Sequence, residues 1–234
     1  MREKAKNFWA GVQAEIPLLF GVFPFGMIYG ALALNAGLSK AASQMMSSIV
    51  FAGSAQFVTA QLVREAAPGF VIVLTIAVVN LRHVLYSASL APYLASLSTP
   101  WKTLLSYLLT DEAYAPTILK YERDGVQPLS HWFLFGAGLA LWSTWQVSTA
   151  LGIFLGTAIP ESWSLDFALP LTFIAMVVPV LGRGRPYVVA SLFAGVTALI
   201  SYSLPYKLGL ILAALVGIAV GTFLEEKQSS KRAM

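Results

Sequence analysis

The chain has 234 residues, of which 57% are hydrophobic and 11% are charged. A soluble domain carries about 25% charged residues, so this composition excludes an ordinary soluble domain and predicts an integral membrane protein. The net charge of +4 comes from basic residues at the ends of apolar segments, so nucleic acid is not an expected partner. The absence of cysteine excludes disulfides, thiolate metal sites and cysteine nucleophiles. The isolated His83 and His131 do not suggest a zinc site, and we expect no cofactor.

A bilayer is crossed by about 20 apolar residues, and eight stretches of the chain approach this length. They are residues 12–34, 43–63, 69–97, 101–119, 131–159, 166–181, 186–204 and 206–224. We therefore predict an all-α, polytopic bundle of about eight transmembrane segments, some kinked or discontinuous, that forms a single transmembrane domain over residues 1–234. The apolar run from Phe8 to Leu34 exceeds the core of about 7–15 residues in a signal peptide, so we expect a transmembrane helix there.

The basic residues predict cytoplasmic N- and C-termini, because cytoplasmic loops are enriched in lysine and arginine. In that orientation eleven basic residues lie on the cytoplasmic side: Arg2, Lys4, Lys6, Arg64, Lys120, Arg123, Arg183, Arg185, Lys227, Lys231 and Arg232. The opposite side has Lys40, Lys102 and Lys207, and Arg82 lies within a segment. Because both termini are basic, we expect an even number of crossings.

The first predicted segment contains Glu15, two prolines and the pair Gly26-x-x-x-Gly30. Proline bends a membrane helix, and glycine at this spacing allows another helix to approach closely. Glu15 falls near the cytoplasmic end, so we expect a solvated carboxylate at the level of the lipid headgroups. Similar glycine pairs, Gly152/Gly156 and Gly217/Gly221, are further contact faces, and three such faces are more than an isolated small bundle needs.

The second segment contains Phe51-Ala-Gly-Ser-Ala-Gln-Phe57. Small residues around Gly53 and Ser54, followed by Gln56, predict either a tight helix contact or an interrupted helix. In the first case Gln56 joins two helices by a hydrogen bond. In the second, freed backbone groups bind the ends of a small solute.

The third segment carries Asn80-Leu-Arg-His83 in apolar surroundings. An arginine at mid-span costs about 2.5–3.5 kcal/mol on insertion scales. At about 100° per residue, one half of the helix gathers Asn80, Arg82, His83, Tyr86, Ser87 and Ser89. Such a face must look at protein or at water. Arg82 therefore either holds two helices together or lines a substrate path.

The fourth segment holds Thr110-Asp111-Glu112 inside an apolar stretch. We expect Arg82 to lie within ion-pair reach of Asp111 or Glu112, because an unpaired buried charge is costly. The acids either serve as that structural partner or carry a proton between the two sides of the membrane. In the fifth segment Trp142 and Trp145 are candidates for the wall of an apolar pocket, although a packed aromatic role is equally compatible with the pattern.

Three blocks in order, Phe51-Ala-Gly-Ser-Ala-Gln56, Asn80-Leu-Arg-His83 with Leu85-Tyr-Ser-Ala-Ser-Leu90, and Leu108-Leu-Thr-Asp-Glu112, resemble the signature of the AzlC family. The likeness continues weakly through Asp166-Phe-Ala-Leu-Pro170. It implies the large subunit of a bacterial or archaeal exporter of branched-chain amino acids in the cytoplasmic membrane, paired with a small, hydrophobic AzlD-type subunit.

An aliphatic amino acid has two opposite charges and an apolar side chain, and the residues are compatible with it. The expected substrate-binding residues are Gly53, Ser54, Gln56, Asn80, Arg82, His83, Tyr86 and Trp145, and the expected proton-coupling residues are Asp111 and Glu112. Arg82 or a broken-helix N-terminus would meet the carboxylate, and Phe51, Phe57 or Trp142 would add to the apolar pocket. Two other classes stay open: a channel or scaffold subunit without coupled transport, and an intramembrane hydrolase using Ser54 with His83.

Overall fold

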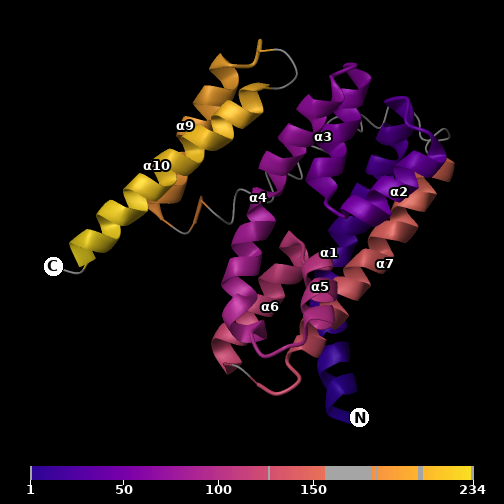
Figure 1. Cartoon of the computed structure of the whole chain (residues 1–234), viewed down its shortest axis with the longest axis vertical. Helices are drawn as coiled ribbons and strands as arrows, with labels where there is room; N and C mark the ends of the chain where they lie inside the picture. Colours follow the sequence, from indigo (N-terminus) through magenta and orange to yellow (C-terminus); the bar gives the residue numbers. More distant parts are fainter. Residues whose placement is uncertain (1, 126, 156–180, 183, 205–207, 233–234) are drawn as a thin grey trace. The chain divides into compact units, whose positions relative to one another are not determined.

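The computed structural model describes residues 2–125, 127–155, 181–182, 184–204 and 208–232. Within them the chain forms nine helices and no strand (Figure 1). It divides into two compact units, Met1–Arg64 with Val79–Trp163 and Glu65–Val78 with Ser164–Met234. The all-helical class predicted from the sequence is confirmed.

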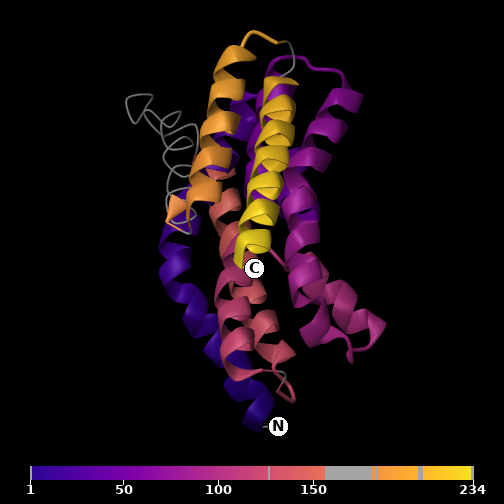
Figure 2. The same cartoon turned by 90° about the vertical axis from the view of Figure 1, so that its left-hand side faces the viewer.

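The first unit is built on two long helices, α1 (Arg2–Asn35) and α7 (His131–Leu155), which run side by side (Figure 2). Glycines bring their backbones together. A Cβ atom added at Gly30 would lie 2.5 Å from the Thr149 carbonyl oxygen and 2.7 Å from the Ile153 nitrogen. One added at Gly152 would meet the backbone of Met27. The contact predicted for the first glycine pair is therefore present, and it is made inside the chain.

The predicted segment 43–63 is two half-helices, α2 (Lys40–Val50) and α3 (Gly53–Arg64), separated by Phe51 in the left-handed region (φ 40°). α2 begins near the C-terminal end of α7, where the Lys40 ammonium lies 5.3 Å from the Phe154 ring centroid. α2 runs from there toward the middle of α7, and the next helix begins where Gly53 lies against Trp145. α3 then turns back toward the end where α2 began (Figure 1). We call α2 and α3 the first hairpin.

The predicted segment 101–119 is also two half-helices, α5 (Thr99–Tyr107) and α6 (Asp111–Asp124). Trp101, in the first turn of α5, packs 5.1 Å from Trp132 at the start of α7. Tyr121, near the end of α6, donates a hydrogen bond of 3.1 Å to the Ser130 carbonyl. The beginning of α5 and the end of α6 therefore both lie at the start of α7, so α5 and α6 form a second hairpin.

The two hairpins correct the predicted topology. Their half-helices have 11, 12, 9 and 14 residues, or about 14–21 Å at 1.5 Å per residue, which is short of the roughly 30 Å hydrocarbon core. The segments predicted at 43–63 and 101–119 are therefore not single continuous helices, because each hairpin enters and leaves at the same end of α7. Arg64 therefore joins Lys40 at the C-terminal end of α7, and Lys102 joins Lys120 at its start.

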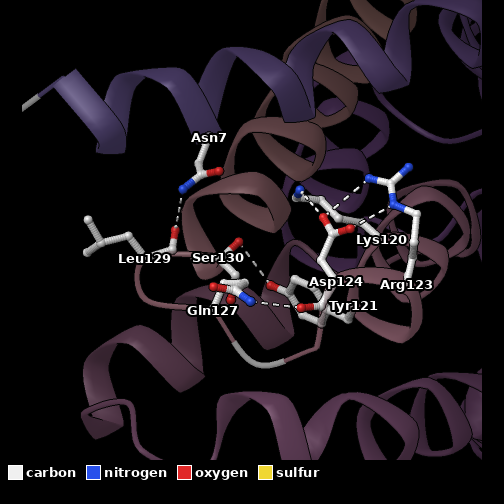
Figure 3. Close-up of polar contacts among 8 residues, drawn as sticks. All are labelled: Asn7, Lys120, Tyr121, Arg123, Asp124, Gln127, Leu129 and Ser130. Carbon is white, nitrogen blue, oxygen red and sulfur yellow. Dashed lines mark hydrogen bonds and ion pairs between the residues drawn. The ribbon is translucent and has the colours of Figure 1, made fainter.

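The α6–α7 connection is tied by polar contacts (Figure 3). Asp124 accepts hydrogen bonds from Lys120 (2.8 Å) and Arg123 (2.7 Å and 3.2 Å). These donors, Arg123 first, hold the pKa of the Asp124 carboxyl well below its usual range. Asn7 of α1 donates to the Leu129 carbonyl at 3.4 Å. The N-terminus of α1 is thereby joined to the same turn.

Helix α4 (Gly69–Leu94) is continuous, and its first ten residues, Gly69–Val78, belong to the second unit. Among the described helices, α1 and α4 are long and apolar enough to cross a membrane. The second unit also contains α9 (Arg185–Ile200) and α10 (Leu208–Arg232), which pack together. There a Cβ added at Gly217 would lie 3.0 Å from Ala194, so this glycine face is also used inside the chain. The predicted segment 166–181 and Gly156 lie outside the described residues, and the number of crossings and the orientation stay predictions.

The glycine contact of α1 with α7 gives a stability prediction. We expect Gly30→Ala to lower the free energy of unfolding by about 1–3 kcal/mol, because the new methyl group meets backbone atoms that cannot move aside. Gly21→Ala is the matched control, since nothing lies within 4 Å of its Cβ position. Thermal unfolding of both variants in detergent measures the difference, and equal midpoints would contradict the packing described here.

Candidate functional site

Arg82 of α4 joins the inner ends of the two hairpins. Its Nη1 donates to Asp111 Oδ2, which forms an ion pair, and its Nη2 donates to Ser54 Oγ at 2.5 Å. The three residues lie in the first unit. The predicted ion pair between Arg82 and one of the two acids is thus confirmed, with Asp111 as the partner.

Both partners of Arg82 occupy the first turn of a half-helix. Ser54 is the second residue of α3, and Asp111 is the first residue of α6. The side chain of Thr110 caps α6 by accepting a hydrogen bond from the Ala113 amide. Helix N-termini carry free N–H groups and a partial positive charge, so they favour acids such as Asp111 and Glu112. The Thr-Asp-Glu sequence is a helix-start signal, and treating it as mid-helix was an error.

Several polar atoms around Arg82 lack a hydrogen-bond partner within the described part of the chain. They are Arg82 Nε, Asn80 Oδ1, His83 Nε2, Asp111 Oδ1 and Gln56 Nε2, all shielded from solvent. His83 Nε2 lies 4.0 Å from Asp111 Oδ1. Buried polar atoms are nearly always paired. This group of unpaired donors and acceptors is therefore suited to a small polar ligand.

Four aromatic side chains form a cluster that packs against Gly53. Trp145 stacks with Tyr29 at 6.1 Å and 18°, and Phe25 stacks with Phe57 at 4.4 Å. The Trp145 indole N–H donates to Gln56 Oε1 at 3.1 Å. A Cβ atom at Gly53 would come within 3.1 Å of Trp145, so glycine lets this wall reach the start of α3. Phe25 and Tyr29 were missed, although their i, i+4 spacing on one helix was a signal that they share a face.

Trp142, the other aromatic proposed for the pocket, is not part of this cluster. Its indole N–H donates to the Tyr107 hydroxyl at 2.7 Å, and that hydroxyl donates to the Ser48 carbonyl. Phe51 lies 5.9 Å from the Tyr107 ring. These residues join the last turn of α5 to the first hairpin, and they are not among the residues that carry the unpaired polar atoms near Arg82.

The seam between α4 and α6 continues away from Arg82. Tyr86 stacks on Tyr114 at 4.5 Å and 19°, and the hydroxyls of Ser89 and Tyr114 are hydrogen-bonded at 2.9 Å. A cavity of about 450 Å³ opens between α4, α5 and α7 on the side where the second hairpin enters. Its mostly apolar lining includes Ser87, Leu90, Lys102, Leu105, Leu109 and Leu134.

Glu15 differs from its predicted place. None of its surface is exposed, and neither carboxylate oxygen has a hydrogen-bond partner among the described residues. It lies close enough to Glu112 for their charges to interact. The solvated carboxylate predicted here was wrong, because Glu15 faces the helices packed against α1, a feature that distance from the chain end does not reveal.

Of the expected site residues, the structure brings together Ser54, Arg82, His83, Tyr86 and Asp111, with Gly53, Gln56 and Trp145 in the adjoining wall. Asn80 lies two residues before Arg82 in α4, where its Oδ1 is buried and unpaired among the described residues. Glu112 follows Asp111 in α6 and influences Glu15. No group of three or more His, Cys, Asp or Glu residues able to hold a metal ion occurs in the ranges that the structure describes. The arrangement can hold a small solute that carries both charges and an apolar part.

The sequence has relatives among known membrane proteins. A model of the family described as "AzlC protein" matches residues 17–159. The inner membrane protein YgaZ of Escherichia coli is 27% identical over 92% of this chain and 88% of its own length. An uncharacterized membrane protein of Archaeoglobus fulgidus is 28% identical over 92% and 94%. The branched-chain amino acid transport protein AzlC of Bacillus subtilis is 27% identical over 74% and 69%. No solved structure matches the chain at a significant level.

The family match covers more than half of the chain, 143 of 234 residues, and it includes the ends of both hairpins and Arg82. The chain is therefore a membrane protein that belongs to the AzlC family.

Proposed function

We propose that residues 1–234 act as one transport domain that exports branched-chain amino acids across the cytoplasmic membrane of a bacterium or archaeon. Family membership and the name of the Bacillus subtilis relative support the substrate class. The observation that carries the proposal is Arg82, which bridges the N-terminal ends of two half-helices. Broken helices that meet in this way supply charged and backbone groups to substrates in many secondary transporters.

The unpaired atoms fit the two ends of an amino acid. Arg82 Nε and the free N–H groups at the start of α3 are donors for the substrate carboxylate. Asp111 Oδ1 and Asn80 Oδ1 are acceptors for its ammonium group. The apolar side chain then faces the wall that includes Trp145. The cavity between α4, α5 and α7 provides the approach to this site.

Export against a gradient needs an energy source, and protons are the proposed one. Asp111 and Glu112 are the acids beside the proposed substrate site, and Asp111 is ion-paired with Arg82. One of these acids would release its proton as the site changes from facing one side of the membrane to facing the other. Substrate binding then changes the proton affinity of the acid, and proton binding changes the substrate affinity by the same factor, so proton flow and substrate flow are coupled.

A small AzlD-type subunit is the proposed partner. The described glycines of the three pairs lie against α1, α7 or α9, so we propose that the partner contacts another surface. A channel or scaffold subunit is a weaker alternative, since a passive pore does not need an arginine bridging two half-helices. A hydrolase is weaker still, because Ser54 Oγ accepts from Arg82 while His83 lies beside Asp111.

The substrate proposal predicts that the purified chain with its small partner exchanges labelled leucine, isoleucine and valine in proteoliposome counterflow. We expect Arg82→Ala to abolish this exchange, because the main cation for the carboxylate is lost. Lysine and glutamate are the control solutes. Rapid, non-saturating flux of all solutes would instead indicate a channel.

The same variant separates stabilisation from transport. Arg82→Ala leaves Asp111 without its cation, so we expect unfolding to become easier by about 1–3 kcal/mol. Arg82→Ala combined with Asp111→Asn should recover most of this loss while staying inactive. If the double variant is no more stable than the single one, the ion pair does not stabilise this site.

Proton coupling predicts that Asp111→Asn or Glu112→Gln abolishes accumulation driven by a pH gradient. Counterflow moves no net proton and should survive in Glu112→Gln, whereas Asp111→Asn also removes a charged acceptor for the substrate ammonium. Both assays use the same proteoliposomes. Normal accumulation by both variants would leave the two acids with a structural role.

The orientation predicts that a cysteine at Gln127 is shielded from an impermeant thiol reagent in intact cells, while one at Lys40 is labelled. The two positions lie at opposite ends of α7, and the chain has no native cysteine. The reverse labelling pattern would invert the proposed topology and with it the direction of export.

A further inference from the structure

Glu15 is a buried acid that the proposed substrate site does not use. It lies in α1, whose packing partners include α7, α3, α6 and α2. None of its surface is exposed, and both carboxylate oxygens lack a hydrogen-bond partner among the described residues. An ionised carboxylate without partners loses several kcal/mol of solvation on burial. This side chain is therefore stable in that place as a carboxylic acid.

The charged groups near Glu15 do not neutralise it. α6 contributes Glu112, which interacts with it, and the neighbouring Asp111 is paired with Arg82. The remaining ionisable side chains of the packing helices lie toward helix ends: His131 in α7, Arg64 in α3, Lys40 in α2, and Tyr114, Lys120, Tyr121, Glu122, Arg123 and Asp124 in α6. Within the described residues, the charged side chain found to act on Glu15 is thus a second acid, and two negative charges at once are disfavoured.

The three acids differ in what stabilises their charge. Asp111 has the Arg82 guanidinium, and both Asp111 and Glu112 lie in the first turn of α6, where the helix dipole favours negative charge. Glu15 lies within a continuous helix and has neither form of compensation. A proton shared among these acids accordingly rests on Glu15.

We propose that Glu15 and Glu112 form a proton site beside the second hairpin, in which Glu15 holds one proton as a carboxylic acid and Glu112 accepts it when the two side chains come into contact. When the proton passes to Glu112, the Glu15 O–H bond breaks, a Glu112 O–H bond forms, and the net charge of the pair stays at −1. Glu112 in turn adjoins Asp111 at the substrate site. The coupling role of the pair rests on the proposed proton-coupled export, whereas its proton occupancy does not.

Infrared difference spectroscopy of the full chain with its small partner in lipid tests the occupancy directly. Between neutral and strongly alkaline pH, we expect loss of a carboxylic-acid C=O band. Glu15→Gln should remove this band, Glu15→Asp should shift its frequency, and the exposed control Glu122→Gln should leave it unchanged. Glu112→Gln should change the pH at which the band disappears. Absence of the band in the parent protein, or its persistence in Glu15→Gln, would overturn the proposal.

Two further results separate this proposal from others. If sodium ions remove the band at neutral pH, the site takes a metal cation and the proton assignment fails. In proteoliposomes, Glu15→Gln should reduce accumulation driven by a pH gradient at least tenfold and keep counterflow within about twofold. Unchanged accumulation would remove the coupling role. A parent protein that moves no branched-chain amino acid would refute the transport proposal, while the infrared result would still decide the occupancy of Glu15.

Discussion

The guanidinium of Arg82 is the constraint on which the first unit depends. A cation in apolar surroundings needs partners in fixed positions, and here they come from two separate hairpins, through Asp111 and Ser54. Each hairpin exposes a helix N-terminus whose partial positive charge would repel Arg82 if no anion intervened. Asp111 resolves this conflict, because it caps one N-terminus with negative charge and neutralises the arginine at once. The site therefore holds together only when all three parts are present.

The sequence predicted the ion pair of this site correctly, but it did not predict how the chain folds around the site. The ion pair could be foreseen, because an arginine and two acids in apolar segments must find one another. The hairpins could not be foreseen, since two half-helices of 11 and 12 residues have the same hydropathy as one helix that crosses. Gly53 and the capping residue Thr110 were local signals that a helix is interrupted, but neither residue indicates that the chain then reverses its direction.

Burial was the second feature beyond reach of the sequence. Glu15 was placed by its distance from a basic terminus, whereas its environment is set by helices more than 90 residues away in the chain, such as α6 and α7. The glycine pairs make a related point. Their spacing predicts close contact correctly, but it does not say whether the neighbour is another chain or, as here, α7 for Gly30 and α9 for Gly217.

The first unit combines two kinds of contact with different mechanical properties. α1 and α7 meet backbone to backbone at Gly30 and Gly152, where no atom can shift without separating the helices. α4 instead meets the hairpins through side chains, such as the Arg82 bridge and the Tyr86–Tyr114 stack. A ligand with matching charges can replace side-chain contacts of this kind with contacts of its own, without moving the α1 and α7 backbones. The rigid pair α1 and α7 carries Glu15 and part of the aromatic wall, and α4 faces it through replaceable polar contacts. This combination of a fixed and a movable part suits the alternating access that the proposed export would use.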